Sequence, residues 1–160
     1  MRMSVEIERK FLVKSVDLES LATKKTRIQQ GYLNHDPKRT VRIRITDKQG
    51  FITVKGASNA SGTTRFEWER EIPKDEAVAL LALSDGTVID KTRFYIPHGA
   101  HVFEVDEFYG DNVGLIIAEI ELNNEAEHFE KPDWIGEEVT GQSKYYNAYL
   151  IQHPFTQWDL

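Results

Sequence analysis

The sequence predicts an α+β protein that is mainly β, with a largely antiparallel sheet and a few helices. Segments in which charged and apolar residues alternate recur along the chain, which is the pattern of a strand with one polar face. Many of these segments are separated only by short turns, which favours antiparallel pairing over the long crossovers of a parallel sheet. The chain has 160 residues, 40% of them apolar and 29% charged, so we expect one domain with a substantial core.

The predicted strands follow the alternation in chain order. In the first strand Glu6, Glu8 and Lys10 share one face. The opposite face is apolar except at Arg9. Later segments repeat this division, and short polar turns such as 97–100 separate them. The full set of predicted strands is residues 5–13, 27–33, 40–46, 51–55, 65–72, 88–96, 101–109 and 114–122.

Patterns with helical spacing lie between these strands. Pro73 suits the first turn of a helix, and apolar residues recur at helical spacing after it. The small, polar segment 56–64 is predicted as a flexible loop, and 134–140 as another loop. The predicted helices are residues 15–25, 73–83, 124–130 and 142–152.

Composition excludes several classes of protein. The net charge of −6 argues against broad, nonspecific binding of nucleic acid. Cysteine is absent, which excludes disulfides and thiolate metal sites. No apolar run is long enough to span a bilayer, and the start of the chain lacks the apolar core of a signal peptide. We therefore expect a cytoplasmic protein, a monomer or homodimer, with neither a membrane nor a nucleic acid as partner.

The polar faces of the strands collect charges of both signs. Outward faces in bulk water would explain any one strand, but the same charges could instead line the wet interior of a barrel covered by helices. Enclosed charges need partners, so an enclosed mixture predicts a ligand of one sign and ions of the other. Arginine and lysine suit phosphate oxygens, and clustered carboxylates suit Mg²⁺ or Mn²⁺. The charged residues are Glu6, Glu8, Glu67, Glu69, Glu104, Asp106, Glu119, Glu121, Lys10, Arg42, Arg44, Lys55, Arg65, Lys91 and Arg93.

The charged segments also resemble, in order along the chain, the sequence motifs of a known protein family. Residues 6–10, Glu-Ile-Glu-Arg-Lys, match the ExExK signature of the CYTH superfamily, also called triphosphate tunnel metalloenzymes. The resemblance runs from about residue 4 to 152 and is strongest to small bacterial members that hydrolyse inorganic tripolyphosphate. Its ordered sequels are Val41-Arg42-Ile43-Arg44, Thr53-Val54-Lys55, Glu67-Trp68-Glu69, Lys91-Thr92-Arg93, Phe103-Glu104-Val105-Asp106 and Glu119-Ile120-Glu121, with Gly31-Tyr32-Leu33 and Gly136-Glu137-Glu138-Val139-Thr140 similar to that subgroup.

The resemblance implies a fold and a set of roles. The fold would be an eight-stranded antiparallel barrel over residues 1–160, with a polar tunnel for a triphosphate and a C-terminal helix near one mouth. The implied metal ligands are Glu6, Glu8, Glu119 and Glu121, with Asp106 serving a second metal. The implied phosphate ligands are Lys10, Arg42, Arg44, Lys55, Arg65, Lys91 and Arg93, with Lys144 and Tyr145 of the last helix nearby. The catalytic candidates are Glu67, Glu69, Asp106 and Lys91, with one carboxylate positioning water.

The leading hypothesis is metal-dependent hydrolysis of tripolyphosphate to pyrophosphate and phosphate. Phosphoryl transfer needs charge neutralisation and an aligned nucleophile more than a protein nucleophile. Alternatives in the same tunnel are an adenylate cyclase and a thiamine or nucleoside triphosphatase. Thiamine would need an aromatic or acidic tunnel mouth, and the strand parity of Trp68 turns its side chain away from the tunnel. A noncatalytic polyphosphate or nucleotide sensor belongs to a different class and needs no metal carboxylates. The remaining hypothesis is a structural interaction domain in which all of the alternating charges face solvent.

Overall fold

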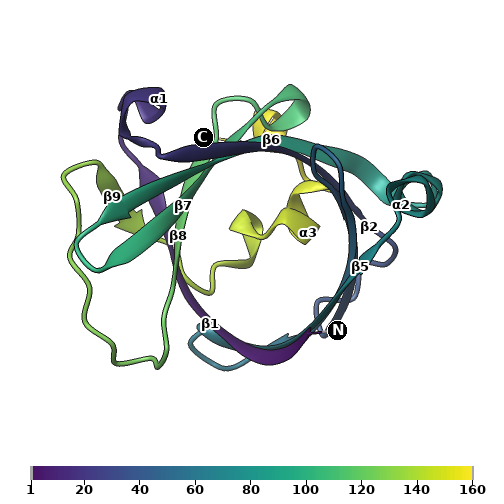
Figure 1. The fold of residues 1–160 in the computed structure, drawn as a ribbon, viewed down its shortest axis with the longest axis horizontal. Coiled ribbons are helices and arrows are strands. Elements are labelled where there is room, and N and C mark those ends of the chain that lie inside the picture. The colour runs from purple at the N-terminus through teal and green to yellow at the C-terminus, as the bar shows by residue number, and fades with distance from the viewer. Residues whose placement is uncertain (1, 160) are drawn as a thin grey trace.

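The computed structural model describes the backbone of residues 2–159 and the side chains of residues 5–159. Nine strands dominate it, and the helices are short (Figure 1). The strands are β1 (Arg2–Val13), β2 (Lys24–Tyr32), β3 (Arg39–Ile45), β4 (Gly50–Ser58), β5 (Thr64–Ile72), β6 (Asp85–His98), β7 (His101–Phe108), β8 (Ile116–Glu121) and β9 (Ile135–Glu138). The α-helices are α1 (Leu18–Leu21), α2 (Lys74–Leu81) and α3 (Asn147–Leu150).

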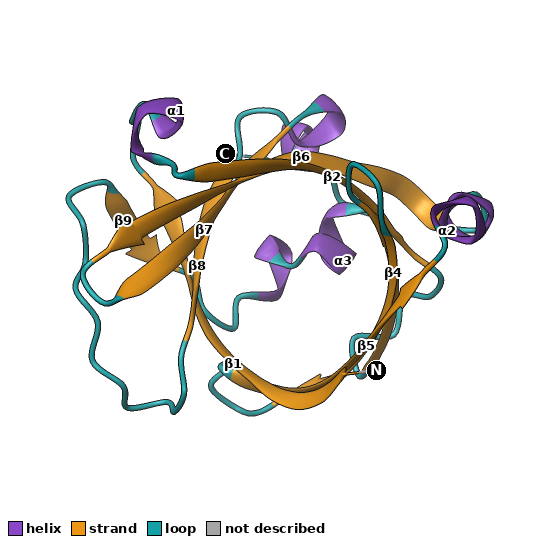
Figure 2. Ribbon diagram, in the orientation of Figure 1, coloured by secondary structure: helices purple, strands orange, loops and turns teal. Residues whose placement is uncertain are grey.

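Eight of the strands close into a ring (Figure 2). The order is β5-β4-β3-β2-β6-β7-β8-β1, and β1 pairs again with β5 to complete the circuit. All pairs are antiparallel. This confirms the expected mainly-β fold with its eight-stranded antiparallel arrangement, and β9 adds a short ninth strand to β1 outside the ring.

The register sends alternate side chains into the ring. The first half of β1 pairs with β5, so that Glu6 lies opposite Arg65. The second half pairs with β8, so that Lys10 lies opposite Glu119. The exception in the sequence pattern, Arg9, points outward. Its guanidinium forms two hydrogen bonds with the Glu138 carboxylate on β9, at 2.9 and 2.5 Å, which explains a charge on the apolar face of β1.

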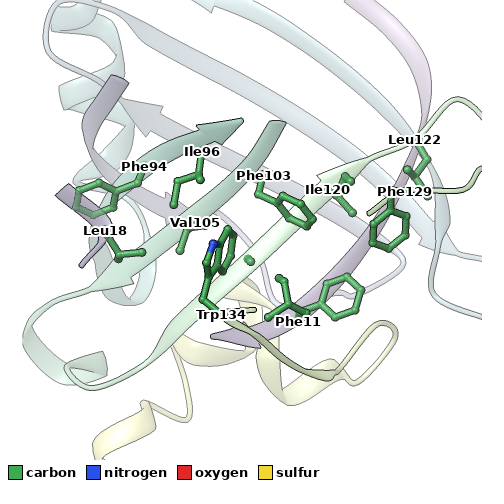
Figure 3. Close-up of a cluster of buried hydrophobic side chains, with 12 residues drawn as sticks. Phe11, Leu18, Phe94, Ile96, Phe103, Val105, Ile120, Leu122, Phe129 and Trp134 are labelled. Atoms are coloured by element: carbon green, nitrogen blue, oxygen red, sulfur yellow. The ribbon is translucent and has the colours of Figure 1, made fainter. Parts of the chain in front are cut away.

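Apolar side chains on the outer face of the ring pack under the peripheral segments. One cluster joins β1, β6, β7 and β8 to α1 and to the segment before β9, with Trp134 edge-on to Phe103 (Figure 3). Another seats α2 on β3 through Ala77 and Ile43. A third cluster lies instead on the inner face at one end of the ring, where α3 packs against inward side chains such as Ile89 and Ile117 and Leu150 is fully buried. With the outer face covered in this way, the polar faces turn inward.

Several predicted elements were wrong in detail. Residues 124–130 form turns and irregular chain instead of a helix, and the predicted loop 134–140 contains β9. The predicted helix 142–152 is broken into a 3₁₀ turn at Ser143–Tyr145 and α3, because Tyr146 between them is extended at φ −75° and ψ 138°. The helix predicted at 15–25 shortens to α1, which begins after the Asp17 cap.

The loop predicted at 56–64 is shorter than expected, since β4 continues to Ser58 and β5 begins at Thr64. The other strand boundaries shift by a few residues, most at β6, which starts at Asp85. None of the helices in the described part of the chain has the length and hydrophobicity needed to cross a bilayer.

Candidate active site

The ring encloses a cavity of about 460 Å³. Every charged residue that the alternation placed on a polar strand face lines this cavity, with the exception of Asp106. The lining also includes Gln30, Tyr32 and Tyr95 from the strands, and Tyr146 and Asn147 from the C-terminal segment. The reading in which these charges face bulk water is therefore wrong.

The two signs of charge occupy different parts of the wall. Carboxylates come from the contiguous strands β7, β8, β1 and β5, and we call this side the acidic arc: Glu104, Glu119, Glu121, Glu6, Glu8, Glu67 and Glu69. Cations on β4, β3 and β6 form the basic arc, with β2 lying between β3 and β6: Lys55, Arg42, Arg44, Lys91 and Arg93. Lys10 and Arg65 are cations within the acidic side. A polyanion on one wall and cations on the other would match this division.

Like charges face each other across the acidic arc. Glu8 lies opposite Glu121, and Glu104 opposite Glu119, in the strand register. Such pairs repel each other. Burial, followed by the Glu119 and Glu6 carboxylates, raises the pKa of Glu8 well above its usual value. Glu8 therefore favours a proton in place of its charge. A divalent cation could replace that proton, and carboxylate oxygens are the donors that Mg²⁺ and Mn²⁺ prefer.

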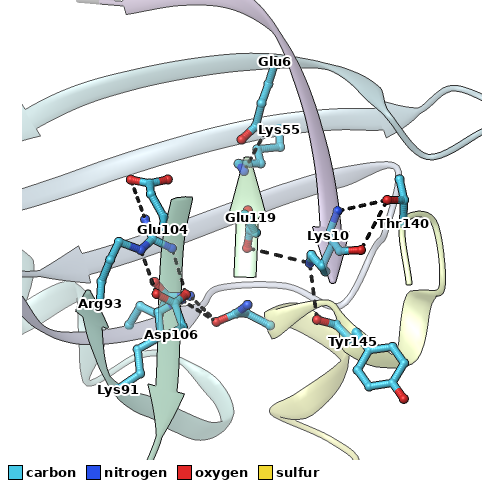
Figure 4. Close-up of polar contacts among 12 residues, drawn as sticks. Glu6, Lys10, Lys55, Lys91, Arg93, Glu104, Asp106, Glu119, Thr140 and Tyr145 are labelled. Atoms are coloured by element: carbon cyan, nitrogen blue, oxygen red, sulfur yellow. Dashed lines mark hydrogen bonds and ion pairs between the residues drawn. The ribbon is translucent and has the colours of Figure 1, made fainter. Parts of the chain in front are cut away.

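Two lysines form ion pairs with carboxylates of the acidic arc (Figure 4). Lys55 Nζ lies 2.9 Å from Glu6 Oε2 and 3.6 Å from Glu67 Oε2. Lys10 Nζ lies 3.9 Å from Glu119 Oε1. Although burial alone would raise it, the charge of Lys10 brings the pKa of Glu119 well below its usual range. Among the described residues, no group of three or more Asp, Glu, His or Cys side chains is already arranged as a metal site.

The basic arc contains more positive charge than its neighbours neutralise. Among the described side chains, no carboxylate pairs with Arg44, whose Nε donates to Gln30 Oε1 at 2.8 Å. Burial, then the charges of Arg42 and Arg93, lower the pKa of Arg44 to about 9. The Nε of Arg42 is buried without a hydrogen-bond partner in the described structure. An anion bound between these guanidinium groups would remove both penalties.

Asp106 does not reach the cavity. Its carboxylate forms a two-pronged ion pair with Arg93, at 2.8 and 2.9 Å, and lies 2.7 Å from Lys91 Nζ. Although burial alone would raise it, these two charges lower the pKa of Asp106 to about 2. Asp106 thus links two cations of the basic arc, and its metal-binding or water-positioning role stays a prediction.

The C-terminal segment covers one end of the ring, and we call residues 140–151 the closing segment. Lys144 points away from the cavity and is exposed beside the Tyr145 and Trp158 rings. The Tyr145 ring is buried in the core, and only its carbonyl oxygen contacts the site, 3.4 Å from Lys10 Nζ. Neither side chain lines the cavity as expected. Tyr146 does so instead, with Lys10 Nζ 4.9 Å from its ring centre.

The sequence did not identify the uncharged side chains that line the cavity. Gln30 and Tyr32 belong to a predicted strand, but they share a face with Ile28. The more polar face of that strand carries Arg27 and Gln29, so the alternation did not mark Gln30 and Tyr32 as cavity residues. Tyr146 and Asn147 carried no such signal either, because the closing segment was expected to be one continuous helix. Trp68 does not line the cavity, in agreement with its predicted parity.

Gly62 in the β4–β5 loop and Gly141 in the closing segment let these two segments approach, because a Cβ on Gly62 would lie 2.3 Å from Gly141 Cα. Gly141 has φ +78°, and a Cβ there would lie 2.8 Å from the Ser61 carbonyl oxygen. Gly110 has a similar φ of +62°, but a Cβ there would meet nothing within 4 Å. Gly141→Ala should therefore destabilise the fold more than Gly110→Ala, by about 1–3 kcal/mol beyond the shared backbone strain.

Chemical denaturation of the two alanine variants would measure this difference, and trypsin cleavage after exposed Lys144 would report whether the closing segment has loosened. Equal unfolding free energies for Gly141→Ala and Gly110→Ala would contradict tight packing of the closing segment on the loop.

A closed antiparallel ring around a cavity with opposed acidic and basic walls defines the structural class of this protein. The CYTH domain family matches residues 4–151, and the chain belongs to that family. It is 46% identical to the inorganic triphosphatase of Acetivibrio thermocellus, over 96% of this chain and 97% of the relative. It is 34% identical to the inorganic triphosphatase of Nitrosomonas europaea, over 91% and 95%.

The fold is also similar to a solved structure. The crystal structure of the inorganic triphosphatase NE1496 superposes with a TM-score of 0.64, at 31% sequence identity, over 91% of this chain and 93% of that one. The likeness thus extends over the strands that form the cavity and over most of the remaining chain.

Proposed function

We propose that this protein hydrolyses inorganic tripolyphosphate to pyrophosphate and phosphate, with Mg²⁺ or Mn²⁺ as cofactor. The observation that carries the proposal is the enclosed cavity with its acidic and basic arcs. The names of the two curated relatives support the same activity, since both are called inorganic triphosphatases. A single CYTH-type domain over residues 1–160, acting in the cytoplasm as a monomer or homodimer, remains our prediction.

The basic arc would hold the substrate. Its guanidinium groups, of which Arg44 has no carboxylate partner among the described residues, match the planar, forked geometry with which arginine binds phosphate oxygens. Arg42 and Arg44 would bind one stretch of the phosphate chain, and Lys91 and Arg93 another. Lys10 would reach it from the acidic side. These cations stabilise the charge that moves onto the leaving pyrophosphate and the transferred group as the bond breaks.

The acidic arc would hold the metal. Glu6, Glu8, Glu119 and Glu121 supply hard oxygen donors, and a bound divalent ion would neutralise phosphate charge and lower the pKa of a coordinated water. Because Lys55 now pairs with Glu6, metal binding at Glu6 would leave Lys55 free to turn toward the phosphates. Glu67 and Glu69 lie next to this group on β5 and are our candidates for accepting the proton of the attacking water.

Phosphate release from tripolyphosphate, ATP and thiamine triphosphate in parallel would test the function. With Mg²⁺ or Mn²⁺ we expect turnover of tripolyphosphate well above that of the other two substrates, and a chelator should abolish it because the acidic arc then lacks its cation. Phosphate and pyrophosphate should appear in equal amounts.

Other outcomes would select a different reading. Formation of a cyclic nucleotide from ATP would identify a cyclase, and preferred turnover of thiamine triphosphate or ATP would reassign the substrate. Tight binding of tripolyphosphate without turnover under any metal condition would identify a sensor. Turnover that is unaffected by the chelator would contradict the role of the acidic arc.

A further inference from the structure

Two amide side chains, the buried Gln30 and the half-buried Asn147, connect the basic arc to the closing segment. Gln30 on β2 is fully buried, and its Nε2 donates to Asn147 Oδ1 at 2.9 Å. Asn147 Oδ1 also accepts from Lys91 Nζ at 2.9 Å, and Gln30 Oε1 accepts from Arg44 Nε at 2.8 Å. Arg44 and Lys91 are thus bridged through two neutral amides that come from opposite ends of the chain.

The direction of these hydrogen bonds is fixed by chemistry. Burial, then the charges of Arg93 and Arg44, lower the pKa of Lys91 to about 7 in spite of Asp106. Arginine and protonated lysine side chains can only donate, so an amide oxygen must face each of them. With Gln30 Oε1 turned toward Arg44, its NH₂ group is left for Asn147, whose oxygen already faces Lys91. The NH₂ group of Gln30 also lies 3.3 Å from Tyr32 Oη. Only one orientation of both amides satisfies all of these contacts.

The bridge restrains the cations and leaves their charge available. Lys91 has three N–H groups, of which Asp106 and Asn147 accept two, so the third remains for a ligand. Arg44 uses Nε, so its two terminal nitrogens remain. An amide accepts a hydrogen bond without cancelling the positive charge, whereas a carboxylate in the same place would compete with a phosphate.

We propose that Gln30 and Asn147 are positioning residues that orient Arg44 and Lys91 for the phosphate chain of the substrate. This inference rests on the proposed function, because it concerns the same cavity. Neither residue needs to touch the substrate. Their effect is to hold the two cations at one fixed separation before the anion arrives, so that ordering them costs nothing on binding.

The test compares Gln30→Leu, Asn147→Leu and the double variant with the wild-type protein. Calorimetric titration with tripolyphosphate in the presence of chelator measures anion binding without hydrolysis. Each single change should weaken binding roughly 10–100-fold, because it leaves a buried donor unsatisfied and frees a cation to move. The double variant should be about as weak as either single variant, since both break the same bridge. Gln29→Leu, exposed in the same strand, is the matched control.

Asn147→Asp separates positioning from simple attachment of the closing segment. The carboxylate keeps both acceptor contacts, so attachment alone predicts wild-type affinity. Our proposal predicts a thermal midpoint at or above that of the wild type together with weaker tripolyphosphate binding and a higher KM, because the added negative charge competes for Lys91.

Wild-type affinity in Asn147→Asp, or in both leucine variants, would overturn the proposal. Loss of affinity that only parallels loss of folded protein in thermal melts would also overturn it. A wild-type protein that binds tripolyphosphate but releases no phosphate would instead refute the proposed hydrolysis, and the binding series would still decide the role of the two amides.

Discussion

Replacement of Arg44 by methionine is expected to remove most of the tripolyphosphate hydrolysis while leaving the fold about as stable as before, because relief of the unpaired charge offsets the loss of the donor to Gln30 Oε1. Arg44 is half-buried in the cavity wall, and its folded-state pKa of about 9 lies below the usual value because desolvation and the neighbouring Arg42 and Arg93 disfavour its charge. Burying the charged form therefore opposes folding. Methionine keeps much of the volume, and among the described carboxylates none loses an ion-pair partner.

The same unneutralised charge is what makes Arg44 valuable to a polyanion. Loss of one charged donor to the transferred phosphoryl group should reduce kcat/KM by about 10²–10³-fold. Phosphate release and denaturant unfolding should be measured on the same preparation. Arg70→Met, on the exposed side of β5, is the control and should leave both unchanged. A strongly destabilised but active Arg44→Met protein would mean that Arg44 supports the wall and does not bind substrate.

The inward charges could be predicted because strand parity is a local property. Arg42 and Arg44, two residues apart, necessarily share a face once their segment is extended. The sequence also contained the reason for turning that face inward, since the apolar faces needed cover. Closure of the ring followed from the family resemblance, and the separation of acids and bases onto opposite walls emerged only from the strand order.

The helical errors arose from contacts between distant parts of the chain. Phe129 lies in the segment 124–130, which the sequence predicted to be helical. Its ring packs edge-on against Phe11 and Phe103 on the outer face of the sheet, and the irregular backbone of this segment allows that contact. The closing segment must bury Tyr145 in the core and turn Tyr146 into the cavity. In one continuous helix the side chains of two adjacent residues point in fixed directions about 100° apart. The extended backbone at Tyr146 instead lets Tyr145 pack in the core while Tyr146 faces the cavity.

Asp106 shows where parity stops being informative. It shares its alternation with Glu104, so the sequence grouped both as cavity carboxylates. The difference lies on the neighbouring strand, where Arg93 is directly opposite Asp106 in the register. Lys91 lies close enough to complete the enclosure. Which carboxylate is enclosed by cations and which lines the cavity depends on that pairing.

Replacement of Asp106 by asparagine should therefore lower the free energy of unfolding far more than the same substitution in a solvent-exposed ion pair. The amide has the same shape but no charge, which leaves Arg93 and Lys91 buried without their shared counterion. Removing one partner of a buried pair typically costs about 3–5 kcal/mol. The matched control is Asp90→Asn, because Asp90 forms an equally two-pronged pair with Arg27, at 2.6 and 2.7 Å, near the surface. Solvent weakens that pair, so its loss should be a small fraction of the Asp106 effect.

The pH dependence of unfolding distinguishes a charge effect from a packing effect at Asp106. Its pKa is about 2 in the folded protein, below an unfolded value of about 3.9. The ion pairs therefore contribute stability above the unfolded pKa, and this contribution is lost as the pH falls toward 2. Denaturant unfolding of the wild type and Asp106→Asn should differ by a constant amount from pH 7 to about pH 5, begin to converge below about pH 4 and differ least near pH 2. A stability difference that stayed constant from pH 7 to 2 would show that the asparagine disturbs packing, and that the charge of Asp106 does not hold the basic arc together.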